Sequence, residues 1–306
     1  MRVQHIQTLV AIAEHGSLRA AAKALGRSQP GLTQALRQAE SELGLSLFVR
    51  TSRGVRLTEV GERILARART ISSEIVRMED EVAQLRGEQK GAVHVCLSPL
   101  AAVRIIPRAL TFFRKSYPDI DVRFTSGLFP GALQPLREGR TDIVIGPAPP
   151  AGMAREINVE HLLYSPIIVV TSADSPYRHA RSIGELADAQ WVMIGAPTGP
   201  GDVFRKPFIE NGFVPPHATT TSESYFGAIS LVESLGAVMT YPGLLLDDLK
   251  KSWNIAEIPI REPIEPLSIC LMTRAGHPLT PAADTFAQCI RRRVASMMSD
   301  KEAVSR

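Results

Sequence analysis

The chain has 306 residues, of which 44% are hydrophobic and 22% charged, and its formal net charge is +4. That length allows two or three compact domains, and that composition is typical of a globular protein. The longest clear apolar run, 167–170, is far shorter than a membrane span, and the N-terminus lacks the apolar core of a secretion signal. Membrane and secreted proteins are therefore excluded from the expected classes, and we expect a cytoplasmic location.

The cysteines do not form a recognisable framework. Neither the number nor the spacing of Cys96, Cys270 and Cys289 fits a metal site or a set of disulfides. Cys96 and Cys270 lie in apolar, β-prone runs, where a free cysteine usually behaves as a small buried hydrophobe. A thiol redox switch stays open at this stage but is not favoured, because no basic group adjoins these thiols in sequence.

Two helices joined by a tight turn are expected near the N-terminus. Ser17 caps the first helix, which ends at Gly26 because glycine can leave a helix with positive φ. Ser28 caps the second helix, which covers 29–43 and has Pro30 in its first turn, where a missing N–H costs nothing.

The second of these helices has one apolar and one polar face. Leu32, Leu36 and Leu43 point inward, which leaves the polar face free to meet a partner. Amide, hydroxyl and guanidinium groups on that face suit base edges and phosphates, and a helix presented in this way fits a DNA major groove. The predicted DNA contacts on this helix are Ser28, Gln29, Pro30, Thr33, Gln34 and Arg37.

A basic hairpin is expected directly after the helix pair. Two β-prone runs within 47–58 flank a polar turn that contains Gly54. Arg50, Arg53 and Arg56 suit phosphate or minor-groove contact. Alone, the hairpin is best interpreted as a solvated surface feature; next to two such helices, a DNA-contacting wing is favoured. The region up to the end of the hairpin carries eight Arg or Lys against three Asp or Glu, and this excess of positive charge agrees with a DNA-contacting surface.

A long amphipathic helix capped by Thr58 follows. Its apolar positions are spaced 4, 3, 4, 3, 4 and 3 residues apart and its flanks are charged. This favours pairing with another helix over packing on its own domain, which is the alternative. The seam consists of Ile64, Ala68, Ile71, Ile75, Met78, Val82 and Leu85. Residues 88–91 then have the glycine and charge of a hinge.

From residue 92 strands and helices alternate, which predicts parallel strands in covered sheets and two similar α/β lobes. Strands are expected at 92–97, 120–125, 142–145, 162–171, 191–194, 219–222, 237–240 and 269–272. Helices are expected at 103–117, 131–138, 203–210, 226–234 and 281–294. We expect the chain to cross between the lobes near His161 and to return near Glu265 and Pro266.

Loops at the carboxyl ends of strands line the ligand cleft of two-lobed α/β proteins. Ser98 and Thr198 each follow a strand and precede a helix whose backbone N–H groups can hold an anion. At each position alone, a turn or cap without a ligand is an equal alternative; together, the two helix starts favour a small organic anion. The expected contacts are Ser98, Pro99, Leu100, Phe129, Pro147, Thr198, Gly199, Pro200, Gly201, Ser222, Phe226 and Tyr241. The three aromatic side chains leave room for an aromatic effector.

This chain resembles the LysR-type transcriptional regulators. The matching positions in the N-terminal region are 20–22, Ser28, Gln29, Pro30, Leu32, Gln34, Glu40, Leu47, Phe48, Arg50, Arg53, Leu57, Thr58 and Gly61. Leu136, Gly139 and Asp142 fit the family pattern Leu-x-x-Gly-x-x-Asp. Gly31 and Ala39 depart from the family's usual Ala and Leu.

The resemblance implies an N-terminal all-α winged helix-turn-helix with a linker helix, followed by a two-lobed α/β effector domain like that of periplasmic binding proteins. The expected division is 1–58 for DNA binding, 59–87 for the dimerising linker, 88–91 for the hinge, 92–161 with 267–306 for lobe I, and 162–266 for lobe II. The implied partners are double-stranded DNA, further copies in a homodimer or homotetramer, a small organic co-inducer and, as a further candidate, RNA polymerase. No cofactor or metal is implied.

An enzyme built on the α/β body is the competing class. The sequence has no nucleophile elbow, no metal-type spacing of histidines and no glycine-rich phosphate loop after a strand. A ligand carrier, the third class, leaves the basic N-terminal region unexplained. We therefore expect a regulator and no enzyme, with the effector, the operator and the sense of regulation left open.

Overall fold

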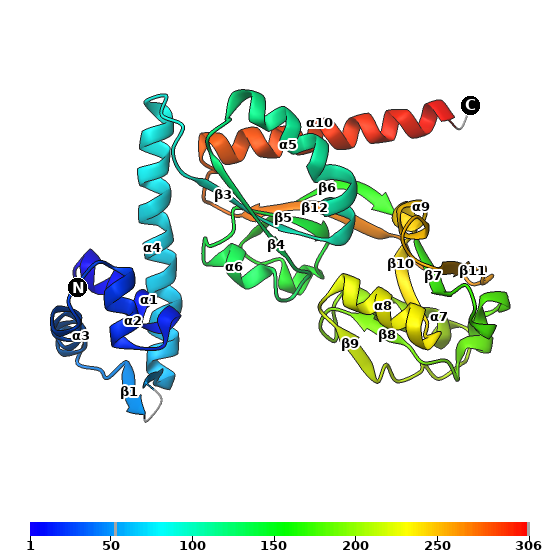
Figure 1. Ribbon diagram of the computed structural model, residues 1–306, viewed down its shortest axis with the longest axis horizontal. Helices are drawn as coiled ribbons and strands as arrows, with labels where there is room; N and C mark the ends of the chain where they lie inside the picture. Colours follow the sequence, from blue (N-terminus) through cyan, green and yellow to red (C-terminus); the bar gives the residue numbers. More distant parts are fainter. Residues whose placement is uncertain (52–53, 305–306) are drawn as a thin grey trace. The chain divides into compact units, whose positions relative to one another are not determined.

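The computed structural model describes residues 1–51 and 54–304 and contains an N-terminal unit, Met1–Gly91, and a C-terminal unit that starts at Ala92 (Figure 1). The N-terminal unit contains helices α1 (Val3–His15), α2 (Leu18–Ala24), α3 (Gln29–Leu43) and α4 (Glu59–Leu85), and strands β1 (Phe48–Thr51) and β2 (Gly54–Leu57). The helix pair, the hairpin and the long helix are confirmed. α1 is a helix that the sequence patterns did not predict.

Hydroxyl side chains start three of these helices as predicted. Ser17, Ser28 and Thr58 each accept a hydrogen bond from the backbone N–H three residues further on, at 3.2, 3.3 and 2.9 Å. Each bond satisfies one of the N–H groups that a helix start leaves without a partner. Gly26 ends α2 with φ of 62°.

The core of the N-terminal unit lies where α1, α2, α3 and β1 meet. Its buried members are Leu9, Ala11, Ile12, Ala21, Ala22, Leu32, Leu36, Ala39 and Leu47. Ala21 and Ala22 are small, so α2 can approach its neighbours closely. Leu65 and Ala68 of α4 are also buried, and α4 packs against α1.

The remaining apolar stripe of α4 is exposed in the single chain. Ile71, Met78, Val82 and Leu85 are 42%, 59%, 43% and 73% exposed. The heptad seam therefore serves two purposes: its first positions, Ile64 and Ala68, pack within the N-terminal unit, and its later positions are available to a partner helix.

Lobe I of the C-terminal unit is built on a five-stranded sheet in the order β4-β3-β5-β12-β6. Its elements are β3 (Ala92–Leu97), β4 (Asp121–Ser126), β5 (Ile143–Pro147), β6 (Ile157–Ser165), β12 (Leu267–Arg274), a π-helical turn (Ala101–Ile105) that continues into α5 (Ile106–Ser116), α6 (Leu133–Arg137), a 3₁₀ turn (Ala151–Met153) and α10 (Pro281–Val304). α5 and α10 lie on one face of the sheet and α6 on the other (Figure 1).

Alternation along the strands explains this layering. Val95, Leu97 and Ile145 belong to the core beneath α5 and α10, where the rings of Phe113 and Phe286 meet edge to face at 5.0 Å. The intervening residues of the same strands face the other way, into a smaller core. That core contains Cys96, Phe129, Ala132, Leu133, Leu136, Val144, Ile157, Cys270 and Met272. Both faces are covered, as expected for this class.

Lobe II holds a three-stranded sheet, β10-β7-β11, and a parallel pair, β8-β9, joined to it by a parallel bridge between Trp191 and Val238. Its elements are β7 (Ile167–Ser172), β8 (Val192–Ile194), β9 (Thr220–Ser222), β10 (Met239–Pro242), β11 (Ile255–Ile258), α7 (Arg205–Glu210), α8 (Tyr225–Leu235), α9 (Leu246–Lys250) and 3₁₀ turns at Pro176–His179, Ile183–Leu186, Pro200–Phe204 and Gly243–Leu245. The buried Trp191 ring stacks on Phe204 at 4.6 Å.

The prediction that the strands of the C-terminal unit pair in parallel was only partly correct. β3 is parallel to β4 and β5, but β12 is antiparallel to β5 and β6, and β10 and β11 are antiparallel to β7. β6 takes the chain out of lobe I and β12 brings it back, so these neighbours must run in opposite directions. β7 leads into lobe II, and β10 and β11 return from it, so both run antiparallel to β7.

The strand expected at 162–171 is two strands in different sheets. Pro166 separates β6 from β7 and is the point at which the chain crosses between the lobes, five residues beyond His161. Proline has no backbone N–H for a sheet ladder, so a strand is readily interrupted there. The return occurs where β12 begins, at Leu267.

Candidate functional site

The outer face of α3 carries exposed polar side chains. Gln29, Gln34 and Arg37 are exposed, whereas Leu32 and Leu36 on the opposite face are 0% and 8% exposed. Pro30 lies in the first turn, after the Ser28 cap. α3 therefore presents two amides and a guanidinium outward from a fixed apolar base.

Thr33 differs from its neighbours on this face. Its side chain is half-buried, and its hydroxyl donates to the Gln29 carbonyl at 2.9 Å. The Ser28 hydroxyl accepts from the Gly31 N–H. Both hydroxyls already have a role within the helix, so Gln29, Gln34 and Arg37 are the predicted contacts on α3 whose exposed polar groups are not used in this way.

The hairpin pairs in the register Phe48 to Leu57 and Thr51 to Gly54. Gly54 has φ of 132°, and a Cβ there would lie 2.6 Å from the Gly16 carbonyl oxygen, so glycine is needed for the hairpin to pack against the end of α1. The exposed Arg56 extends from β2. Of the other predicted wing contacts, Arg53 and the Arg50 side chain lie outside the described residues.

Glu40 holds the hairpin to α3. Its carboxylate accepts hydrogen bonds from the backbone N–H groups of Leu47 and Phe48, at 2.7 and 3.1 Å. The resemblance included Glu40 as a matching position without a role. The structure assigns it the role of fixing where β1 starts relative to α3, through charge-assisted hydrogen bonds.

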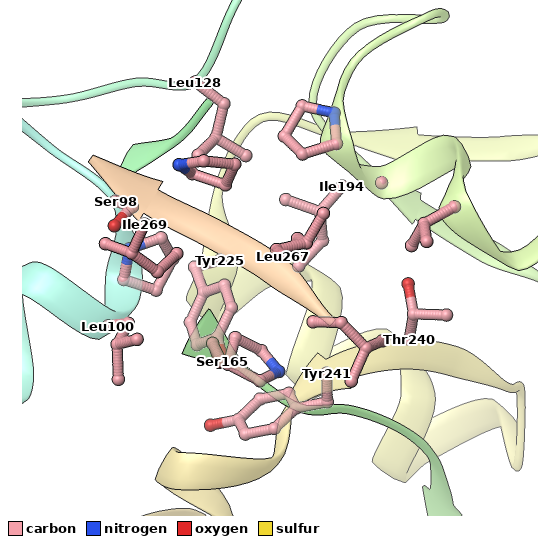
Figure 2. A pocket seen from close by; sticks show the side chains of 17 residues that line it. Ser98, Leu100, Leu128, Ser165, Ile194, Tyr225, Thr240, Tyr241, Leu267 and Ile269 are labelled. Atoms are coloured by element: carbon pink, nitrogen blue, oxygen red, sulfur yellow. The ribbon is translucent and has the colours of Figure 1, made fainter. Parts of the chain in front are cut away.

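A cavity of about 60 Å³ lies between lobe I and lobe II (Figure 2). Residues at the ends of β3, β5 and β12 line it from lobe I, and residues of β7, β8, β10 and α8 line it from lobe II. Seven predicted effector contacts are among the lining residues: Ser98, Pro99, Leu100, Pro147, Pro200, Gly201 and Tyr241. The cavity lies at the carboxyl ends of the parallel strands, as predicted for this architecture.

Ten lining residues were not predicted: Leu128, Ser165, Ile167, Ile194, Val203, Tyr225, Thr240, Pro242, Leu267 and Ile269. Ser165, Ile167 and Leu267 flank the two crossings between the lobes, so their position depends on where the chain crosses. Tyr225 begins α8 and Thr240 precedes Tyr241. The apolar strand ends beside the crossings were the signal that could have identified several of them.

Three predicted contacts in the loops do not line the cavity. Phe129 is 8% exposed and packs in the core beneath α6. Thr198 is exposed, with φ of 66°, and is not among the lining residues. Gly199 is buried by backbone contacts: a Cβ there would lie 3.0 Å from the Phe129 carbonyl oxygen, so this glycine permits close approach of two loops.

Two predicted contacts near α8 also lie outside the cavity lining. The Ser222 hydroxyl donates to the Ser224 carbonyl at 2.8 Å and closes a local turn before α8. Phe226 is 71% exposed, on the outer side of α8. The neighbouring Tyr225 faces the cavity instead, because a shift of one residue along a helix turns the side chain by about 100°.

No charged side chain is among the 17 described residues that line the cavity. Its polar groups are the hydroxyls of Ser98, Ser165, Thr240, Tyr225 and Tyr241. The Ser98 hydroxyl accepts from the Ala101 N–H at 3.4 Å, where the helical segment begins. An anion here would therefore meet hydroxyls and the start of that helix, and no basic side chain.

Two tyrosines form the floor of the cavity. The Tyr225 and Tyr241 rings lie 5.4 Å apart between centroids. Burial raises the pKa of Tyr225 far above its usual value, and the nearby Tyr241 adds to the effect. Burial likewise raises the pKa of Tyr241, and the carboxylate of Asp248 contributes. Both phenols are therefore neutral hydrogen-bonding groups at physiological pH.

An ion pair joins the two lobes next to this floor. Arg104 Nε of lobe I lies 2.6 Å from Asp248 Oδ2 of α9 in lobe II, and the two side chains are 37% and 29% exposed. A second arginine, Arg205 at the start of α7, forms an ion pair within lobe II: its Nε lies 3.7 Å from Asp202 Oδ1. Neither arginine lines the cavity.

All three cysteines are buried, as expected for Cys96 and Cys270. Burial raises the pKa of each thiol, including Cys289, where the charge of Arg292 acts in the opposite direction but is the smaller effect. The expectation that no basic group adjoins the thiols is therefore wrong for Cys289, because Arg292, three residues further along the chain, lies close enough to act on it. Raised pKa values make these thiols poor nucleophiles.

Within residues 1–51 and 54–304, no group of three or more His, Cys, Asp or Glu side chains is placed to hold a metal ion. The helices described there are also too short or too polar to span a bilayer.

Two family models match the chain. One, for bacterial regulatory helix-turn-helix proteins of the lysR family, matches residues 3–62. The other, for the LysR substrate binding domain, matches residues 86–295. Together they include α1 to α4 with the hairpin, and most of both lobes.

Curated relatives extend over nearly the whole chain. The HTH-type transcriptional regulator GalR of Pseudomonas putida is 27% identical over 294 residues, which cover 95% of this chain and 73% of that protein. The RuBisCO operon transcriptional regulator of Allochromatium vinosum is 26% identical over 301 residues, which cover 96% of this chain and 97% of that protein. Both relatives are transcriptional regulators.

A solved structure shows the same fold. The LysR family transcriptional regulator CbnR superposes with a TM-score of 0.68 at 22% identity, covering 96% of this chain and 99% of that chain. Because the family models match more than half of the chain, this protein belongs to the LysR family of DNA-binding transcriptional regulators, with an N-terminal helix-turn-helix domain and a C-terminal effector-binding domain.

Proposed function

We propose that α3 reads the operator in the major groove and that the β1–β2 wing contacts the DNA backbone. The observation that carries this assignment is the division of α3, with Gln29, Gln34 and Arg37 exposed above the buried Leu32 and Leu36. Glutamine amides suit adenine and arginine suits guanine, while arginines of a wing suit phosphates. The full proposed contact set is Ser28, Gln29, Pro30, Thr33, Gln34, Arg37, Arg50, Arg53 and Arg56.

Operator affinity tests this assignment. DNA that the native protein selects from a randomised pool serves as the operator, and gel shift measures its dissociation constant at fixed salt. Gln34→Ala and Arg37→Ala are each expected to weaken selective binding by ~1–3 kcal/mol, because each would remove a base contact. Lys250→Ala removes an exposed cation of lobe II and is the matched control. Native affinity in both α3 variants would contradict the groove assignment.

The assembly proposed here is a homodimer, or a homotetramer made of two such dimers, held together through the exposed part of α4. A dimer brings two copies of α3 to a partly palindromic site. We retain 1–58, 59–87 and 88–91 as functional divisions. Because β6 (Ile157–Ser165) pairs within the lobe I sheet, the lobe boundary expected after residue 161 moves to Pro166, so lobe I is 92–165 with 267–306 and lobe II is 166–266. A cytoplasmic location and contact with RNA polymerase follow from the regulatory role as proposals.

We propose that the interlobe cavity binds a small organic anion with an apolar body. The lining is mostly apolar, and the anionic end would meet the Ser98 hydroxyl and the backbone N–H groups at the start of the helical segment. The rings of Tyr225 and Tyr241 also line the cavity, so the proposed class of effectors includes aromatic acids. The cavity is smaller than the roughly 300–1,000 Å³ of most ligand pockets, so binding requires the lobes to separate or side chains to move.

A thermal-shift screen of benzoate and aliphatic carboxylates tests the effector class, because a ligand that binds only the folded protein raises its melting temperature. Thr240→Val keeps the side-chain shape and removes a cavity hydroxyl, so the shift should shrink. Thr198→Ala, at an exposed residue outside the cavity, should leave it unchanged. If a carboxylate shifts the melting temperatures of Thr240→Val and Thr198→Ala equally, the effector binds elsewhere.

A further inference from the structure

A second and larger hollow, of about 440 Å³, lies on lobe I between α5 and α10, outside the interlobe cavity. Its lining residues are Arg108, Phe112, Lys115, Ser116, Thr285, Gln288, Cys289, Arg292, Arg293 and Ser296. We call it the α5–α10 groove. None of these described residues is acidic, and four of them are basic. The interlobe cavity, in contrast, has no charged lining residue.

Helix geometry explains why the basic groups gather here. Arg108, Phe112 and Lys115 are four and three residues apart on α5, so they share one face of that helix. Gln288, Arg292 and Ser296 recur every four residues on α10, which packs alongside α5 (Figure 1). The two faces form opposite walls of the groove.

The neighbours of Arg292 on α10 are already paired. Arg291 forms a two-pronged ion pair with Glu160 of β6, with N–O distances of 2.8 Å from both Nε and Nη2. Arg293 Nε donates to the Arg104 carbonyl at 3.3 Å. Arg291 is therefore neutralised on the sheet side, and Arg293 is tied to the backbone of the π-helical turn.

The other three basic groups lack an acidic partner among the residues that the structure describes. Arg108 and Arg292 are exposed and form no ion pair there, and the Lys115 ammonium lies 5.4 Å from the centre of the exposed Phe112 ring. Three positive charges lining one hollow repel each other, and an anion with two or more charges would relieve this repulsion.

We propose that the α5–α10 groove is a second ligand site, distinct from the effector cavity, that binds a small phosphorylated metabolite. Its volume lies in the range of small-molecule pockets, roughly 300–1,000 Å³. Guanidinium groups match phosphate oxygens in pairs, and Lys115 adds a mobile charge. A single carboxylate offers one charge to three cations, whereas a di- or triphosphate chain can neutralise all three.

Isothermal titration of the full-length protein with sodium triphosphate, at constant ionic strength in chloride, tests this proposal. We expect one triphosphate per chain, and we expect the double variant Arg108→Gln with Arg292→Gln to bind at least tenfold more weakly. Both arginines are exposed, so the variant should fold, and its melting temperature without ligand should equal or exceed that of the native protein.

Two control variants separate the groove from general charge effects. Arg123→Gln with Lys250→Gln removes two exposed cations from the same unit and should keep native affinity. Arg37→Gln with Arg56→Gln removes two cations from the proposed DNA contacts and should also keep it. The proposal is overturned if either control loses as much affinity as the groove variant, or if the groove variant binds like the native protein. Tighter binding of hexaglutamate than of triphosphate would overturn it in favour of an acidic peptide.

Discussion

Single residues decide how closely elements approach in the N-terminal unit, and Gly61 is the strictest case. A Cβ on Gly61 would run into the Leu47 carbonyl oxygen, and Leu47 is held there by its hydrogen bonds with Thr58 and Glu40. Gly61→Ala should therefore push α4 away from β1 and lower the free energy of unfolding by ~1–3 kcal/mol, the usual cost of overpacking. Urea unfolding measures this.

The control for Gly61→Ala is Gly152→Ala, since a Cβ on Gly152 meets nothing within 4 Å. The control should change the unfolding midpoint little. Equal stability of the two variants would show that α4 can shift without cost, against the tight packing described above.

The buried tyrosines give stability a pH dependence on the alkaline side. The pKa of Tyr225 in the folded protein is raised above its ordinary value of 10.0, so the unfolded chain loses this proton first as the pH rises. The contribution is complete below about pH 10 and is lost above it, by about 1.4 kcal/mol at pH 11. Tyr225→Phe should lose less stability between pH 9 and 11 than the native protein, measured by urea midpoints.

Tyr164→Phe is the matched control, because that ring is 64% exposed. Its pH profile should follow that of the native protein. If Tyr225→Phe and the native protein lose equal stability above pH 10, the phenol ionises without cost in the folded state and the cavity floor is open to water.

At the level of elements, α4 makes the clearest prediction. Met78 and Val82 are 59% and 43% exposed on the stripe that the single chain leaves uncovered. Val82→Glu would place a charge in a helix–helix seam, where burial without a partner is costly. We expect the dimer to dissociate at a concentration at least tenfold higher, measured by sedimentation velocity. Glu79→Gln, next to the stripe, should not change it.

How well an element could be predicted depends on whether its signals are local. Ser17, Ser28 and Thr58 mark their helices because a cap bond forms within three residues, so α2, α3 and α4 were predictable. α1 begins after Arg2 without a side-chain cap bond, and it was missed. Sheet direction was missed for β12 because it depends on a pairing with β6, about a hundred residues away in sequence.

The cavity shows the same limit. Ser98 and Pro147 follow directly from strand ends, which a local pattern shows. Tyr225 and Phe226 are adjacent in sequence, and only the direction of α8 relative to the sheets decides which one faces the cavity. Ser165 and Leu267 reach the cavity because the crossings lie there, which the strand pattern across 162–171 did not show. Contacts that depend on two lobes could not be placed from either lobe's sequence alone.

For the whole molecule, the proposed regulation requires that a ligand in the cavity changes the equilibrium between lobe arrangements. The Arg104–Asp248 ion pair bridges the lobes beside the cavity floor, so it favours the arrangement in which the two groups meet. If the proposed effector acts through this equilibrium, the factor by which it changes operator affinity must equal the factor by which operator changes effector affinity. Asp248→Asn removes the charge from the pair and should change both factors to the same extent.

This whole-molecule prediction is checked by measuring operator dissociation constants with and without the carboxylate found in the screen, and carboxylate dissociation constants with and without operator. Lys251→Gln is the control, because Lys251 contacts the same Asp248 at 3.2 Å but is 73% exposed and lies on the same lobe. Native coupling factors in Asp248→Asn would show that the ion pair does not distinguish the lobe arrangements. Changed factors in Asp248→Asn with native factors in Lys251→Gln would exclude the Lys251 contact as the cause and favour the bridge between lobes, since Asp248→Asn weakens both ion pairs and Lys251→Gln only the one within lobe II.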